Sequence, residues 1–116
     1  MEHQSLTARE LTLLLAIIRC GDHAYGPAIN DELRKRTGEG LSPGALYSAL
    51  DRLERKKLVD ARIGESTPER GGRRKRYLIV NGSGQIAIAH ATYAIDQLRH
   101  GVQLPEPSNG GAVAWT

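Results

Sequence analysis

The sequence contains only one cysteine, Cys20, among its 116 residues. An intrachain disulfide is therefore impossible, and there is no pair of cysteines that could ligate zinc. No apolar run approaches the ~20 residues that a membrane-spanning helix needs, and the first residues lack the basic and apolar regions of a signal peptide. These absences lead us to expect a protein of the reducing cytoplasm that has no membrane partner.

Motifs of catalysis and metal binding are also missing. The sequence has no phosphate-binding loop and no spacing of nucleophile, base and acid, and its four histidines are scattered. Asp96 and His100 lie one helical turn apart, but His90 lies on another side and about 15 Å away along the axis at the rise of an α-helix, so one chain cannot bring all three to one ion. We therefore expect no enzymatic activity, no metal and no cofactor.

Positive charge is present and is concentrated in one segment. The chain has 16 Lys and Arg against 13 Asp and Glu, a net charge of +3 and a pI near 9.3. A run of charged residues is often only a solvated loop, but a basic cluster can also bind an anionic partner. The position of the cluster among the predicted elements decides between these two interpretations. The cluster consists of Arg70, Arg73, Arg74, Lys75 and Arg76.

The first helix is predicted from a capping box, Thr7 to Glu10, and should run to about Cys20. It carries two apolar stripes, which imply burial on two sides, either within the domain or between subunits. We interpret Cys20 as a small buried apolar residue; the alternative is that its thiol acts as a redox switch. The stripes are Leu11, Leu14, Leu15 and Ile18, and Leu13, Ile17 and Cys20.

Prolines mark the starts of the next two helices. Pro27 suits the first position of a second helix, which Gly38 can end in a left-handed conformation. Ser42 is a good N-cap for a third helix, with Pro43 at its first position. This third helix should pack on the core through a stripe at helical spacing, formed by Leu46, Ala49, Leu50 and Leu53.

Beyond the third helix the period changes to that of strands. Residues 58–63 and 75–80 predict two strands around a polar loop, residues 64–72, and Asn81 is a plausible N-cap for a last helix, from about residue 82 to 100. Five residues at spacings of three and four, the last just past this range, form a heptad-like seam. The seam could cap the domain core, but we assign it, together with Leu13 and Ile17, to a dimer interface. The seam consists of Ile88, Ala91, Ile95, Leu98 and Val102.

This order, α-α-α-β-β-α, predicts a mainly α fold with a small β-hairpin, the winged helix-turn-helix. In that fold the third helix enters the major groove and the hairpin follows the phosphates. We expect a DNA-binding domain at residues 1–81, a dimerisation helix at 82–103 and a flexible tail at 104–116. The expected DNA-binding residues are Ser42, Pro43, Gly44, Tyr47, Ser48, Arg52, Arg70, Arg73, Arg74 and Lys75.

Three motifs resemble PadR-type transcriptional regulators over roughly residues 11–84. They are Tyr25-Gly26, Ser42-Pro43-Gly44-x-Leu46-Tyr47-x-x-Leu50-x-x-Leu53-Glu54, and Gly72-Arg73-Arg74-Lys75-Arg76-Tyr77. The resemblance implies a dimeric bacterial repressor that binds a palindromic operator and is commonly released by a small effector, with the C-terminal helix contributing to dimerisation. The short last helix suggests the branch with a small C-terminal domain.

Several alternatives stay open at this point. Tyr47 could be a core aromatic, since it follows Leu46 of the apolar stripe directly. Ser48 and Asp51 depart from the residues common in the family, so the operator sequence cannot be inferred. Asp51 on the groove side would either accept a hydrogen bond from cytosine or discourage binding. The whole domain could also be a winged-helix interaction module that binds an acidic protein without recognising specific DNA.

Overall fold

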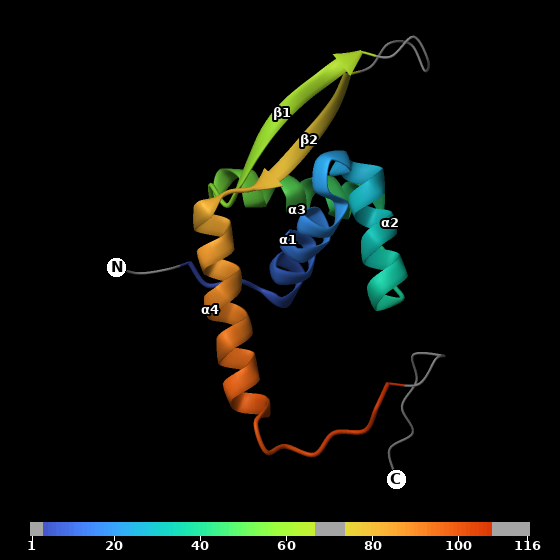
Figure 1. The fold of residues 1–116 in the computed structure, drawn as a ribbon. Helices are drawn as coiled ribbons and strands as arrows, with labels where there is room; N and C mark the ends of the chain where they lie inside the picture. The colour runs from blue at the N-terminus through green and yellow to red at the C-terminus, as the bar shows by residue number, and fades with distance from the viewer. Residues whose placement is uncertain (1–3, 67–73, 108–116) are drawn as a thin grey trace.

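The computed structural model describes residues 4–66 and 74–107, so Arg70 and Arg73 lie outside the described residues. The predicted order of elements is confirmed, with one added 3-10 turn after the first helix (Figure 1). The elements are α1 (Ala8–Cys20), η1 (Gly21–His23), α2 (Gly26–Thr37), α3 (Pro43–Arg55), β1 (Val59–Ser66), β2 (Arg74–Val80) and α4 (Gly82–Arg99).

The helix starts follow the capping residues. The Thr7 hydroxyl accepts a hydrogen bond from the Glu10 N–H at 3.1 Å, and the Glu10 carboxylate accepts one from the Thr7 N–H at 2.9 Å, which confirms the capping box of α1. Ser42 caps α3 and Asn81 caps α4, each accepting a backbone N–H of the first turn. Gly38 ends α2 with φ at 87°, a left-handed conformation that favours glycine. Local sequence therefore determines where these helices begin and end.

The core lies between the helices and the base of the sheet. Leu46, Leu50 and Leu53 of α3 are buried in it, as the third-helix stripe predicted. Leu13 and Ile17 of α1 are 0 % and 1 % exposed within a single chain. Their assignment to a dimer interface is therefore corrected, because they have no surface left to bury against a second copy. The other buried apolar residues are Leu14, Ala16, Ala24, Ile29, Leu33, Leu58, Val59, Leu78, Val80 and Ala87.

The two strands form an antiparallel wing that projects away from the helices (Figure 1). Val59 lies opposite Val80 and Arg62 opposite Tyr77. The N–H of Leu78 donates to the carbonyl of Ala24 at 2.8 Å, so the segment after η1 is joined to β2. β1 runs to Ser66, three residues beyond the predicted end, past an irregular step in the pairing.

The last helix starts against the core and then leaves it. A Cβ at Gly84 would lie 2.3 Å from the Leu58 carbonyl oxygen, so only glycine allows the first turn of α4 to approach the segment after α3 this closely. Ala87 is buried, whereas the helix is exposed from Tyr93 onward. In Figure 1 the C-terminal half of α4 stands clear of the other helices.

Candidate nucleic-acid interface

The helix α3, here called the reading helix, is buried on one side and exposed on the other. Leu50 and Leu53 are 2 % and 0 % exposed, whereas Tyr47, Ser48 and Arg52 are exposed. Three leucines at helical spacing prevent the helix from rolling on the core, so the exposed side chains are held in a fixed direction. Ser42, Pro43 and Gly44 are also exposed, at the N-terminal end of the reading helix.

Tyr47 joins the two helices of the helix-turn-helix unit. Its side chain is 46 % exposed, and its ring lies over Gly26 at the start of α2. A Cβ at Gly26 would lie 2.6 Å from the Tyr47 hydroxyl oxygen and 2.8 to 2.9 Å from two ring carbons. Tyr47 is thus neither a core residue nor a free surface residue: one part of the ring packs on backbone and the rest faces solvent.

A stack of aromatic rings and cations anchors the wing to the start of α2. The Lys75 ammonium lies 4.6 Å from the centre of the Tyr25 ring, and the Arg62 guanidinium lies 4.6 Å from the centre of the Tyr77 ring. The two rings are 5.9 Å apart in a tilted arrangement. Such contacts each contribute about 0.5–1 kcal/mol at partly exposed sites. Lys75 is therefore held beside α2, and Tyr25 and Tyr77 have a structural role that spacing alone did not reveal.

Arg76 points from the wing to the reading helix, not outward. Strand alternation places it on the same face of β2 as the buried Leu78. Its Nη1 lies 3.0 Å from Asp51 Oδ1, and its Nη2 donates to Glu54 Oε1. Sequence reasoning missed this contact, because nothing in the local pattern shows where the wing lies relative to the reading helix.

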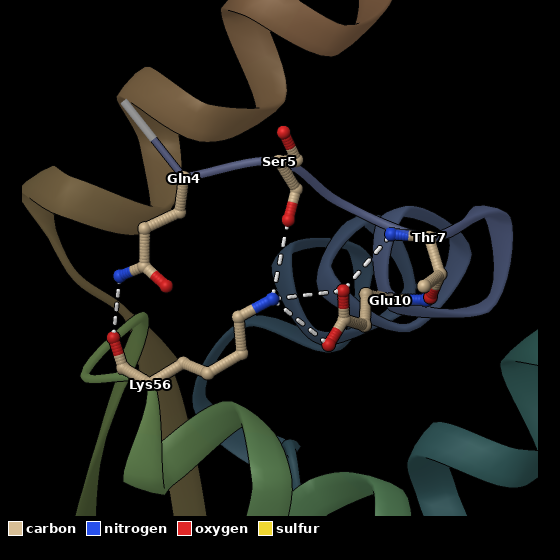
Figure 2. Close-up of polar contacts among 5 residues, drawn as sticks. All are labelled: Gln4, Ser5, Thr7, Glu10 and Lys56. Carbon is tan, nitrogen blue, oxygen red and sulfur yellow. Dashed lines mark hydrogen bonds and ion pairs between the residues drawn. The ribbon is translucent and has the colours of Figure 1, made fainter. Parts of the chain in front are cut away.

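Lys56 ties the C-terminal end of the reading helix to α1 and to the segment before it (Figure 2). Its ammonium lies 3.0 and 3.1 Å from the two Glu10 carboxylate oxygens and donates to the Ser5 carbonyl at 3.2 Å. Gln4 in turn donates its amide N–H to the Lys56 carbonyl at 2.7 Å. Burial by itself raises the pKa of Glu10, but the Thr7 N–H and the Lys56 ammonium together bring it below its ordinary value.

The predicted seam of α4 divides into two parts. Ile88 and Ala91 are half-buried, with Ile88 packed on the core of its own domain. Ile95 and Leu98 are 45 % and 79 % exposed. Val102 is 54 % exposed but lies beyond α4, which ends at Arg99, so it does not continue the seam on the helix as predicted. The seam borders a hollow of about 350 Å³ between α4 and the segment that leads into α1, with Leu6, Leu11, Ala91 and Ile95 among its lining residues.

Cys20 and the acidic residues form no further centre in the described part of the chain. Burial raises the pKa of the Cys20 thiol, and Glu32 and Asp31 raise it further, so the reactive thiolate is disfavoured. Within residues 4–66 and 74–107, no three His, Cys, Asp or Glu side chains are grouped so that they could hold a metal ion. None of the helices among these residues has the length and apolar character to cross a membrane.

Comparison with solved structures identifies similar folds. A transcriptional regulator from Clostridium thermocellum has a TM-score of 0.64 at 24 % identity, with 78 % of this chain and 85 % of that chain covered. A PadR family transcription regulator from Clostridium difficile has a TM-score of 0.59 at 26 % identity, with 78 % and 94 % covered. F93 from STIV, a winged-helix DNA-binding protein, has a TM-score of 0.62 at 18 % identity, with 82 % and 95 % covered.

Comparison of the sequence itself is consistent with the fold. No curated protein matches it. The family model described as "Transcriptional regulator PadR-like family" matches residues 14–90, which is more than half of the chain and includes the reading helix, the wing and the start of α4. The motifs around Tyr25, Ser42 and Tyr77 all lie in that range. The chain therefore belongs to the PadR-like family of transcriptional regulators.

Proposed function

We propose that this protein acts as a homodimeric repressor that binds a two-fold symmetric operator through one reading helix per subunit. The observation that carries the proposal is the exposed face of the reading helix. Tyr47, Ser48 and Arg52 supply hydrogen-bonding groups and a cation, and the buried leucines behind them hold these groups at fixed geometry. This is the arrangement by which a helix reads base edges in the major groove.

The wing supplies the contacts that do not depend on base sequence. Lys75 lies on β2 beside the start of α2, and Arg70, Arg73 and Arg74 carry further positive charge in the neighbouring sequence. Cations on the hairpin favour DNA by releasing counterions from the phosphates, which makes binding steeply dependent on salt. The wing thus contributes affinity, and the reading helix contributes selectivity.

The exposed part of the α4 seam supports the homodimer. Ile95 and Leu98 form an exposed apolar stripe on a helix that stands clear of its own domain, and the exposed Val102 follows just beyond the end of that helix. Burying such a stripe against its copy gives the two-fold symmetry that places two reading helices one turn of DNA apart. Occupation of an operator by this dimer accounts for repression.

The hollow of about 350 Å³ beside α4 falls in the size range of small-molecule sites and supports release by a small effector.

The proposal is tested by selecting bound duplexes from a random DNA library at moderate salt. We expect enrichment of one motif with two-fold symmetry. If no motif is enriched, specific DNA recognition is ruled out. A second candidate function, a module that binds an acidic protein through its basic wing, would instead give salt-sensitive binding to all duplexes and other polyanions alike.

A further inference from the structure

The reading helix carries two acids on the side that faces the wing. Asp51 and Glu54 lie one turn apart, and their side chains are 57 % and 42 % exposed. Together with Ser48 and Arg55 they line an open hollow beside the helix. Carboxylates next to a DNA-binding face repel the phosphates, and each uncompensated acid there opposes binding.

Arg76 is bound to both acids at once. One nitrogen of its guanidinium lies 3.0 Å from Asp51 and the other donates to Glu54, so the planar group bridges two carboxylates one turn apart. Arginine suits this arrangement because its donors are fixed in a fork, whereas lysine is a single point charge. Among the side chains that the structure describes, which do not include those of residues 65–74, these two ion pairs are the only ones between the wing and the reading helix.

The same contact determines where the wing lies. Leu78 and Val80, on the same face of β2, are buried at the base of the sheet. Arg76 is the next residue outward on that face, opposite the exposed Ile63, where apolar packing no longer holds the strands on the domain. Beyond that base, the Arg76 ion pairs hold this face of the wing on the reading helix, while the Lys75–Tyr25 contact holds the wing beside α2.

We propose that Arg76 is a positioning residue for DNA recognition: it neutralises Asp51 and Glu54 and holds the wing on the reading helix, and it does not bind phosphate itself. This inference rests on the proposed DNA binding. It assigns to one basic residue of the wing a different role from that of Lys75. Its consequence is that removal of the two acids removes the need for their neutralisation, which we expect to be the larger part of the effect of Arg76 on DNA affinity, whereas its hold on the wing is measured in the free protein.

The experiment compares DNA affinity among three variants. We expect Arg76→Gln to weaken binding to the selected duplex at least ~10-fold, because it exposes two acids beside the DNA. Adding Asp51→Asn and Glu54→Gln to Arg76→Gln should restore binding to within ~3-fold of the wild type, since the coupled residues act as one unit. The control adds Asp31→Asn and Glu39→Gln instead, which changes the net charge equally at exposed acids that do not contact Arg76, and it should stay weak.

Two outcomes would overturn the proposal. A triple variant as weak as Arg76→Gln, or no tighter than the charge-matched control, would rule out the neutralising role, and together with unchanged amide exchange along β2 it would show that Arg76 binds phosphate directly. Wild-type affinity of Arg76→Gln would show that it has no role. Amide exchange in the free protein adds a readout without DNA: Arg76→Gln should speed exchange along β2, which loss of a phosphate contact would not do. If the wild type binds no duplex, the proposed function fails, and exchange decides whether Arg76 holds the wing.

Discussion

The ammonium of Lys56 lies within 3.1 Å of both carboxylate oxygens of Glu10, although the two residues are 46 positions apart in the sequence. Glu10 is 4 % exposed and also accepts the N–H of Thr7. One carboxylate therefore both starts α1 and holds the C-terminal end of the reading helix. The pair couples the position of the reading helix to the segment that borders α4.

Lys56→Met should lower the free energy of unfolding by about 1–3 kcal/mol, because it leaves a buried carboxylate without its cation. Urea denaturation measures the change. Glu10→Gln combined with Lys56→Met is the matched control and should recover part of the loss, since the buried charge is then absent. Unchanged stability of Lys56→Met would show that the ion pair contributes nothing.

Stability should fall in acid, because the pKa of Glu10 is lowered in the folded state. Between that lowered pKa and the ordinary glutamate value of about 4.3, the unfolded chain binds more protons, so stability increases with pH. The contribution is complete above the ordinary value and is lost as the pH falls through the folded pKa. Glu10→Gln should flatten this part of the stability profile. Part of the dependence of stability on pH should persist in this variant, because Arg19, and to a smaller extent Arg36, lower the pKa of Glu32.

Gly26→Ala should weaken DNA binding without unfolding the domain. The new methyl group would lie 2.6 Å from the Tyr47 hydroxyl oxygen, and the half-exposed ring can move outward. We expect ~10-fold weaker binding, as for loss of one good contact worth about 1.4 kcal/mol. In a Tyr47→Ala background the same change should have no further effect on affinity. A further loss there would mean that Gly26 acts by a route other than its contact with Tyr47.

Arg52→Ala and Lys75→Ala should weaken binding in different ways. Loss of a base contact at Arg52 should reduce the binding free energy for the selected sequence by about 1–3 kcal/mol and change that for unrelated DNA little. Loss of a phosphate contact at Lys75 should weaken binding to all DNA sequences about equally. It should also reduce the slope of the logarithm of the binding constant against the logarithm of the salt concentration by about 1. Titrations of cognate and unrelated duplexes at several salt concentrations separate the two. Lys35→Ala, an exposed cation on α2, is the control.

Leu98→Arg should dissociate the proposed dimer, because a charge would replace the most exposed apolar side chain of the α4 seam. Sedimentation and operator titration should show a monomer and weaker, less cooperative binding. Gln97→Arg adds the same charge at the preceding residue, about 100° around the helix, and should stay dimeric. A Leu98→Arg protein that remains dimeric would place the interface elsewhere.

Local sequence determined the elements of this protein and much of their capping. Thr7, Ser42 and Asn81 each satisfy backbone donors within their own helix start, so their effect could be predicted from spacing. The apolar stripe of the reading helix was predictable for the same reason: a period of 3.6 residues identifies the buried face. The residues off that stripe, Ser48 and Arg52 among them, are thereby placed on the outward side by the sequence alone, whereas the sequence left Tyr47 open between the core and the surface.

Tertiary structure alone decided which distant residues meet. Two apolar stripes on α1 look equivalent in the sequence, and only packing shows that Leu13 and Ile17 are enclosed by their own domain while Ile18 stays exposed. The sequence likewise left Asp51 as an acid on a DNA-binding face, and only the return of β2 brings Arg76 to it. Local pattern encodes which side of an element is apolar, whereas the partner of a charged side chain depends on how whole elements pack, and that is not a local property.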